Sequence, residues 1–274
     1  MGLILESSFF NGVDKISNEG CSSIVYALSD KVAYKRYRQT DYISSKFARR
    51  SEKLDLLCEE KIDDVIIPTD KVFRRLEYCD DFYLTGHLLP RVKCGKIRNL
   101  KLLLLSFFCS LSDKALHLLE VEAIIKRCHE SPNYIVIGDT NGSNFLIDEE
   151  GKVKFVDFDN VGIGDFPFDV GSLYTSAAQR IVPSAKGQDI DKVALGFMVM
   201  DDLCKPRDQL GIRTFAYAYS VELQDISDHI DMLDVSKASK EVFRALISDT
   251  TDRPYVGEVI REISGKEGNF LVKR

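Results

Sequence analysis

The sequence contains no run of apolar residues long enough to cross a lipid bilayer. A membrane-spanning helix needs about 20 such residues, and the longest apolar run here extends only from Leu102 to Leu111. We interpret that run as a helix buried in a protein core. The sequence also shows no signal peptide, and Glu6 stands where a myristoylation motif has Ser or Thr. We therefore expect a cytoplasmic protein without a membrane partner.

The cysteines lack the pattern of a disulfide framework or a zinc site. There are seven of them, scattered between Cys21 and Cys204, and no two form a C-x-x-C pair. An odd number of scattered cysteines favours reduced thiols, as in a cytosolic protein.

A large excess of positive charge is also missing. The chain has 37 basic and 43 acidic residues, a net charge of −6, which argues against nucleic acid as a main partner. With 45% hydrophobic and 29% charged residues, the composition is that of an ordinary globular protein. A chain of 274 residues can form one large domain or two lobes that share a cleft.

The stretch from residue 134 to 169 carries the residues most suited to chemistry. Its centre has the pattern of a β-hairpin, with one apolar strand at 145–148 and a second at 153–156. Residues 149–152 are polar, include a glycine and are interpreted as the turn.

Pairing the strands around that turn sets Asp148 opposite Val153, and Asn144 opposite Asp157 at the open end. Paired strands lie about 4.8 Å apart, so the side chains of Asn144 and Asp157 could converge on one point. Asp139 precedes Asn144 by five residues. An amide and two carboxylates suit a cation such as Mg²⁺, with one carboxylate left for a substrate proton.

The first part of the chain is expected to be rich in strands. Strands are predicted near Ile16 and at residues 24–28, 32–37, 65–68, 71–73 and 82–85, with one helix at 41–61. Residues 86–90 are interpreted as a connector, because a glycine and a proline bracket them. The turn that contains Gly20 could bind phosphate through backbone N–H groups, although a simple hairpin turn fits it equally well.

Lys35 and Glu52 have two possible interpretations each. A lysine in a strand is usually a solvated edge residue, and a glutamate on a helix is usually solvated too. The alternative is that Glu52 reaches Lys35 and fixes its position.

The remainder of the chain is expected to be mainly helical. Ser112 and Asp113 could cap a helix that ends near His129. Further helices are predicted at residues 170–181, 189–204, 212–225, 236–248 and 254–264. The predicted layout is a strand-rich lobe of residues 1–86 and a helical lobe of residues 87–274.

Six short motifs, in this order, resemble those of the protein-kinase superfamily. They are G-C-S-S-I-V from Gly20, V-A-Y-K ending at Lys35, D-T-N-G-S-N from Asp139 to Asn144, D-F-D from Asp157, D-V-G-S-L from Asp169, and T-D-R-P-Y around Arg253. Each motif is weak alone, but together they extend over residues 15 to 264. The resemblance implies an α+β fold with two lobes: a small antiparallel sheet with one helix, and a larger, mainly helical lobe.

The resemblance also implies a role for each motif residue. Asp139 would orient and deprotonate an acceptor hydroxyl, and Asn144 and Asp157 would hold Mg²⁺ on the phosphates of ATP. Lys35 would contact the α- and β-phosphates and contribute to catalysis. The implied nucleotide-binding residues are Gly20, Lys35, Glu52 and Leu89.

The chain departs from the protein kinases at several of these positions. Ile137 and Gly138 replace the usual histidine and arginine, and Asn141 replaces a lysine. The D-F-D motif, in place of D-F-G, is more similar to the aminoglycoside and choline phosphotransferases. Only residues 158–168 separate Asp157 of the D-F-D motif from Asp169 of the D-V-G-S-L motif. No A-P-E motif is present.

Arg253 therefore lacks the glutamate that pairs with it in protein kinases, and a local acid such as Asp165 is a possible substitute. The short segment also removes the usual platform for a peptide. The preferred prediction is an ATP- and Mg²⁺-dependent kinase acting on a hydroxyl, with Ser or Thr of a protein as acceptor. The alternatives are a small-molecule kinase and a nucleotide-binding, pseudokinase-like interaction module.

Overall fold

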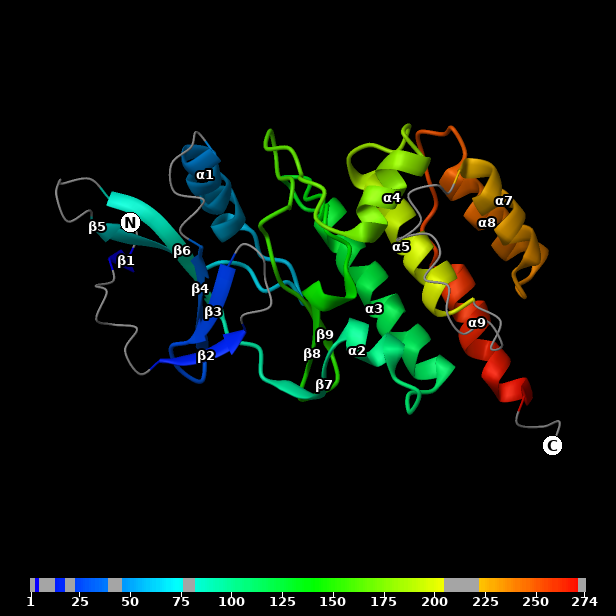
Figure 1. The fold of residues 1–274 in the computed structure, drawn as a ribbon, viewed down its shortest axis with the longest axis horizontal. Coiled ribbons are helices and arrows are strands. Elements are labelled where there is room, and N and C mark those ends of the chain that lie inside the picture. Colours follow the sequence, from blue (N-terminus) through cyan, green and yellow to red (C-terminus); the bar gives the residue numbers. More distant parts are fainter. Residues whose placement is uncertain are drawn as a thin grey trace. The chain divides into compact units, whose positions relative to one another are not determined.

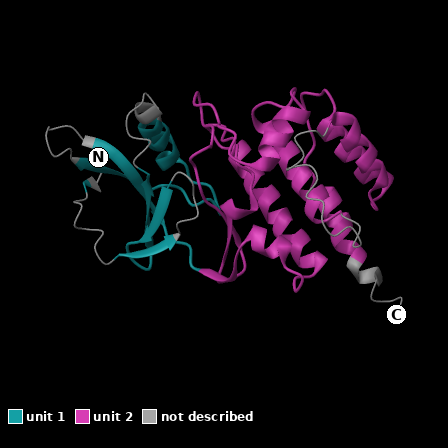
Figure 2. Ribbon diagram, in the orientation of Figure 1, with its two compact units in different colours: residues 1–93 teal, residues 94–274 magenta. Residues whose placement is uncertain are grey.

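A computed structural model describes residues 3–4, 13–17, 23–38, 46–75, 82–204 and 222–270 of the protein. The chain divides into two compact units, unit 1 with residues 1–93 and unit 2 with residues 94–274 (Figure 1; Figure 2). In the described residues, unit 1 is a sheet with one helix, and unit 2 is mainly helical with a smaller sheet. The predicted α+β, two-lobed, kinase-like fold class is therefore confirmed.

Unit 1 is built on a six-stranded sheet in the order β1-β5-β6-β4-β3-β2. Neighbouring strands run antiparallel, except that β1 pairs in parallel with β5. The strands are β1 (Leu3–Ile4), β2 (Asp14–Ser17), β3 (Ser23–Ala27), β4 (Val32–Tyr37), β5 (Asp70–Arg75) and β6 (Phe82–Pro90).

Helix α1 (Lys46–Glu59) packs on one face of this sheet. Lys71 of β5 ties the two together, because its ammonium group donates to the hydroxyl of Ser51 (3.1 Å) and lies 2.6 Å from the carboxylate of Asp55. The predicted helix at 41–61 is thus present, and residues 41–45 lie outside the described part of the chain.

Two sequence-based expectations for unit 1 are wrong. Residues 65–68 form no strand; they follow a turn and precede β5. The expected connector at 86–90 is instead the end of β6, next to the sheet's interior strand β4. Gly86 reflects a close approach of two strands, since a Cβ there would lie 2.0 Å from the carbonyl oxygen of Lys35. The structural boundary after residue 93 lies beyond the predicted lobe boundary after residue 86, because β6 continues to Pro90.

Unit 2 combines a three-stranded sheet, in the order β7-β8-β9, with a group of helices. The strands are β7 (Cys94–Asn99), β8 (Phe145–Asp148) and β9 (Val153–Phe155). The helices are α2 (Leu100–Leu105), α3 (Leu111–His129), the 3₁₀-helix η3 (Gly142–Asn144), α4 (Leu173–Ile181), α5 (Gln188–Asp202), α7 (Leu223–Met232), α8 (Lys237–Ile247) and α9 (Gly257–Phe270).

The core of unit 2 forms around α3 and α5. Eleven of the fifteen residues of α5 are buried, which makes it a central helix. Helix α3 packs against α9, β9 and α5. Its N-cap is Ser110, which forms a capping box with Asp113, so the helix begins slightly earlier than the cap predicted at Ser112.

The longest apolar run of the sequence does not form one buried helix. Helix α2 ends at Leu105, and a loop connects it to α3. Leu102 and Leu105 are exposed on α2, and Phe107 and Phe108 are exposed in the loop. The prediction of a core helix over this run is therefore wrong.

The hairpin of β8 and β9 is present, but its register differs by one residue from the prediction. Ile147 pairs with Val153, and the backbone N–H of Asp148 donates to the carbonyl of Lys152 (3.0 Å). The turn thus contains three residues rather than four, with Gly151 at φ +84°. A type I turn followed by a left-handed glycine is a common three-residue hairpin loop, and it sets this register.

The helices predicted after residue 169 are found in four of five cases, within a few residues, as α4, α5, α8 and α9. The helix predicted at 212–225 lies mostly outside the described residues, and α7 was not predicted as a separate helix. No helix in the described ranges is both long enough and apolar enough to span a membrane.

Candidate active site

One buried carboxylate, that of Asp191 in the first turn of α5, holds the loop that contains Asp139. Its Oδ2 accepts a hydrogen bond from the N–H of Ile137 (2.7 Å), and its Oδ1 accepts one from the N–H of Gly138 (3.0 Å). The hydroxyl of Thr140 donates to Oδ1 as well (3.2 Å). Asp191 therefore fixes the backbone before Asp139 and the side chain of Thr140 after it.

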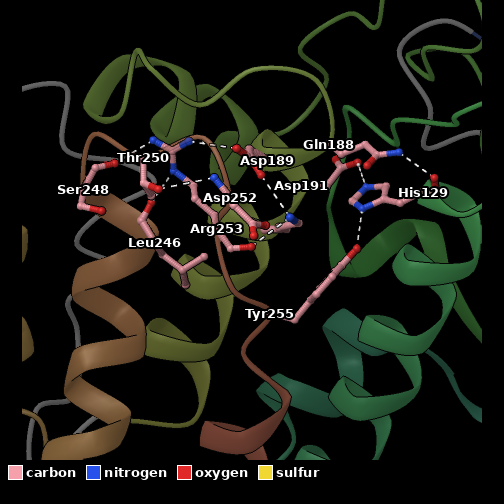
Figure 3. A network of polar contacts seen from close by, with 11 residues as sticks. His129, Gln188, Asp189, Asp191, Leu246, Ser248, Thr250, Asp252, Arg253 and Tyr255 are labelled. Atoms are coloured by element: carbon pink, nitrogen blue, oxygen red, sulfur yellow. Dashed lines mark hydrogen bonds and ion pairs between the residues drawn. The ribbon is translucent and has the colours of Figure 1, made fainter.

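A second layer of polar residues supports Asp191 (Figure 3). The ring of His129 contacts Oδ2 of Asp191 through Nε2 (3.1 Å) and the hydroxyl of Tyr255 through Nδ1 (2.8 Å). Burial raises the pKa of Tyr255 above its ordinary value, and the carboxylates of Glu130 and Glu122 act in the same direction. We assign the hydroxyl as donor to Nδ1, so that Nε2–H donates to the carboxylate. This arrangement links the segment before α9 to the loop of Asp139.

Arg253 anchors the same segment from a buried position (Figure 3). Its guanidinium lies 3.0 Å from Oδ2 of Asp189 and donates to the carbonyl oxygens of Leu246 (2.9 Å) and Ser248 (2.8 Å). The expectation that Asp165 would pair with Arg253 is wrong. Asp189, in the first turn of α5, is the acid that the fold brings to the guanidinium.

Close packing confines Asp139 itself. The side-chain amide of Asn160 donates to its Oδ2 (3.1 Å). A Cβ on Gly171 would lie 2.6 Å from the Asp139 carboxylate and 2.1 Å from the Asn160 amide. Gly138, which precedes Asp139, has φ +65°, a conformation that favours glycine. Both glycines therefore allow the buried carboxylate to lie where it does.

Asn144 and Asp157 lie at the open end of the hairpin. The amide nitrogen of Asn144 donates to the carbonyl oxygen of Asp139 (3.1 Å), so its amide oxygen is the atom left to bind a ligand. The carbonyl of Asn144 accepts from the N–H of Val156 (2.8 Å), so Val156 lies opposite Asn144 and the predicted pairing of Asn144 with Asp157 is wrong by one residue. Asp157 is half-buried with φ +81°, a conformation that Asp adopts more readily than most residues.

This pair of oxygen donors fits Mg²⁺. The ion takes oxygen ligands and is commonly held by one or two protein groups together with phosphate and water. The described residues include no cluster of three or more His, Cys, Asp or Glu side chains that could hold a metal ion. The metal role of both residues stays a prediction.

The segment that follows Asp157 is folded tightly on itself. Val136 and Gly162 exchange two backbone hydrogen bonds (2.9 and 2.8 Å), and Ile163 and Phe166 exchange two more (both 3.0 Å). Residues 158–168 thus form a compact turn beside the loop of Asp139.

In unit 1, Lys35 is only 5% exposed on the interior strand β4. It lies opposite His87 of β6, whose ring contacts the hydroxyl of Tyr37 (2.8 Å). The guanidinium of Arg50, from α1, lies 4.3 Å from the centre of the Tyr37 ring. Because Lys35 and Tyr37 share one face of β4, Lys35 faces the α1 side of the sheet. The interpretation of Lys35 as a solvated edge residue is therefore wrong.

Glu52 is exposed, and in the described part of unit 1 no ion pair joins it to Lys35. Asp55 and Glu59 of the same helix are also exposed, whereas Glu60, directly after α1, is buried. The expected contact of Glu52 with Lys35 is absent, and Glu60 is the acid that this part of the fold places inside.

The other predicted nucleotide-binding residues have different outcomes. Gly20 lies outside the described residues. Leu89 lies half-buried on β6, opposite Ala33 and on the same sheet face as Lys35. The binding roles of both stay predictions.

Sequence reasoning missed the supports of the Asp139 loop, namely Asp191, His129 and Tyr255. A signal was present for the first two, because each is a polar residue at a buried position of a largely apolar helix. Such a residue must find hydrogen-bonding partners in the core. Which partners those are depends on the tertiary fold, which the sequence pattern does not supply.

A comparison with known families matches this part of the chain. Residues 101–191, from α2 to the first turn of α5, match the model of the APH phosphotransferase enzyme family. The matched segment is about a third of the chain and includes Asp139, Asn144, Asp157 and Asp191. The resemblance to the protein-kinase-like superfamily, in its aminoglycoside and choline phosphotransferase branch, is thereby confirmed. No curated protein matches the chain.

Proposed function

We propose that this protein transfers the γ-phosphoryl group of ATP to a hydroxyl group in a Mg²⁺-dependent reaction. One observation carries the proposal: a buried carboxylate, Asp139, is held by a dedicated network within the segment that matches a phosphotransferase family. Such a network maintains a side chain in one position, and phosphoryl transfer depends mainly on positioning and electrostatics.

Asp139 orients the acceptor hydroxyl and accepts its proton in this proposal. The amide of Asn160 holds one oxygen of the Asp139 carboxylate, while Asp191 holds the backbone before Asp139 and the hydroxyl of Thr140 after it. Asn144 and Asp157 would hold Mg²⁺, which, when bound, offsets the negative charge of the phosphates.

Unit 1 would supply the remaining contacts to the nucleotide. Lys35 would bind the α- and β-phosphates, and Gly20 and Leu89 would line the nucleotide site. For the acid that supports Lys35, the burial of Glu60 makes it a better candidate than the exposed Glu52.

We further propose a small molecule as the acceptor, in preference to the Ser or Thr of a protein predicted first. Residues 158–168 form a compact turn, closed by the Ile163–Phe166 hydrogen bonds and attached to the segment before Asp139 by the Val136–Gly162 hydrogen bonds. An extended peptide would need a longer segment as a platform. The family match, to a phosphotransferase enzyme family, supports the same choice.

The first experiment measures nucleotide binding and turnover in one set of variants. ATP with Mg²⁺ should raise the Tm of the wild type, and ADP release should exceed that of Asp139→Asn by about a hundredfold or more. Asp139→Asn should still show the Tm shift, because the amide keeps the shape of the site. Asp165→Asn is the matched control, since Asp165 is an exposed acid of the neighbouring turn; its turnover should equal that of wild type.

The same data separate the enzyme from the pseudokinase-like module. A Tm shift without any turnover above Asp139→Asn, over both metabolite and protein acceptors, would support the interaction module. Absence of a Tm shift would contradict both. Transfer of ³²P from γ-labelled ATP should label a compound in a metabolite panel; labelling of proteins alone would reverse the choice of acceptor.

A further inference from the structure

The loop between α2 and α3 exposes two adjacent aromatic side chains. Phe107 is 92% exposed and Phe108 is 101% exposed, although phenylalanine is among the residues most often buried. Leu102 and Leu105 of α2 are also exposed, and their spacing of three residues places them on one helix face. We call these four residues the apolar patch. Exposed apolar residues in one contiguous stretch commonly mark an interaction site.

The loop that carries the patch is fixed at both ends. The N–H of Ser106 donates to the carbonyl of Leu103 (3.1 Å), and the N–H of Phe108 donates to the hydroxyl of Ser106 (3.2 Å). The ammonium group of Lys114, on α3, donates to the carbonyl of Leu104 (2.8 Å) and so joins the two helices. The rings therefore project from a supported turn.

Positively charged residues directly precede the patch in the sequence. Lys96, Arg98 and Lys101 are exposed, and within the described ranges none of them forms an ion pair. The whole sequence from Phe82 to Ser112 contains no acidic residue, although acids outnumber bases in the complete chain. The next acid, Asp113, is engaged in the capping box of α3.

We infer that the apolar patch docks on the surface of an anionic phospholipid membrane. Apolar side chains that insert at the boundary of headgroups and acyl chains, next to cations that meet anionic lipids, are the two components of peripheral membrane binding. The charge complementarity of the three cations favours this partner over another protein. The side chains would lie on the membrane surface, since no helix among the described residues is long and apolar enough to cross it.

The patch is also connected to the loop of Asp139. The backbone of Lys101 packs against η3, since a Cβ on Gly142 would lie 2.9 Å from the Lys101 nitrogen. Docking through the patch would therefore hold η3, with Asn144 at its end, close to the lipid surface. The inference is independent of the proposed phosphoryl transfer.

The absence of tryptophan from the sequence gives a direct test. Phe108→Trp creates the single tryptophan of the chain in the patch, and Met232→Trp places it at an exposed position of α7 as the matched control. Vesicles of phosphatidylcholine with phosphatidylserine should shift the emission of Phe108→Trp to shorter wavelength. Met232→Trp should not shift, and vesicles of phosphatidylcholine alone should produce little change.

Sedimentation with the same vesicles measures the contributions of the apolar side chains and of the cations in separate variants. The double variant Phe107→Glu/Phe108→Glu should bind at least about tenfold more weakly. Loss of all three cations, in Lys96→Gln/Arg98→Gln/Lys101→Gln, should weaken binding by about a hundredfold, because each cation near an anionic surface contributes about fivefold. These substitutions are at exposed positions, and an unchanged Tm verifies the fold.

Three results would overturn the inference. The first is unchanged emission of Phe108→Trp with anionic vesicles. The second is equal binding of the wild type and the double Glu variant. The third is an emission shift that depends on protein concentration without vesicles, which would identify a second copy of the chain as the partner.

Discussion

The polar residues of the two units are held in place by different means. In unit 2, side chains hold the loop of Asp139 in place. Asp191 binds the backbone of the loop, His129 contacts Asp191, and Tyr255 contacts His129. In unit 1, Lys35 depends on the backbone, since pairing of β4 with β3 and β6 sets where its side chain points. A strand positions a side chain through its ladder, whereas an irregular loop needs side chains to fix its backbone.

This difference predicts that polar substitutions destabilise unit 2 more than unit 1. The largest effect is expected for Asp191→Ala, which leaves the buried N–H groups of Ile137 and Gly138 without an acceptor. We expect a loss of about 4 kcal/mol in the free energy of unfolding, and turnover reduced to background. Urea denaturation measures the first quantity, and Asp249→Ala, at an exposed acid, is the control. Equal effects of the two substitutions would contradict the comparison.

Arg253→Met should have the next largest effect. The substitution removes one of the two cations that pair with Asp189, the other being Lys192, and the donors to the carbonyl groups of Leu246 and Ser248. Breaking a buried pair on one side costs about 3 kcal/mol or more. Arg244→Met is the matched control, because Arg244 pairs with Asp231 at the surface and such pairs contribute less than about 1 kcal/mol. A similar loss for both arginines would show that burial of Arg253 is unimportant.

Tyr255→Phe should have a moderate effect and should act on the loop of Asp139. The ring stays in place beneath the ammonium groups of Lys126 (4.5 Å) and Lys192 (5.0 Å), but His129 loses the donor at Nδ1. We expect a loss of about 1 kcal/mol. Turnover should fall through kcat, with KM for ATP nearly unchanged, because only the position of Asp139 is disturbed. A change confined to KM would show that Tyr255 does not act through the position of Asp139.

The smallest effects are expected in unit 1, where the two candidate acids can be compared directly. Glu52→Gln should leave stability within about 0.5 kcal/mol of wild type, since the side chain is exposed. Glu60→Gln should destabilise by less than about 1 kcal/mol and should weaken the Tm shift with ATP, since Glu60 is buried. A stronger effect of Glu52→Gln on nucleotide binding would restore it as the acid that fixes Lys35.

The sequence predicted the two lobes and the hairpin because these depend on local patterns. Alternating strands, helical periodicity and a turn with glycine all lie within short windows. The register of β8 and β9 was one residue off because it depends on whether the turn has three or four residues. The three-residue turn depends on the left-handed conformation of Gly151. The sequence alone does not show whether a glycine adopts that conformation.

Two further predictions were wrong because the tertiary fold decides them. Asp165 is near the D-F-D motif in sequence, but Asp189 is the acid that α5 brings to Arg253. The apolar run at 102–111 has the composition of a core helix, yet the break after Leu105 turns Phe107 and Phe108 outward. In both cases the tertiary fold determines the outcome, and neither composition nor nearness in the sequence predicts it.

The contacts of Arg253 and Tyr255 also constrain the order of events during synthesis. The loop of Asp139 leaves the ribosome long before the segment that contains these two residues. Until that segment is translated, His129 has no Tyr255 hydroxyl and Asp189 has no Arg253 guanidinium to bind. A nascent chain can therefore complete its hairpin of β8 and β9 early, but the final support of the loop of Asp139 forms only after α8 has been made.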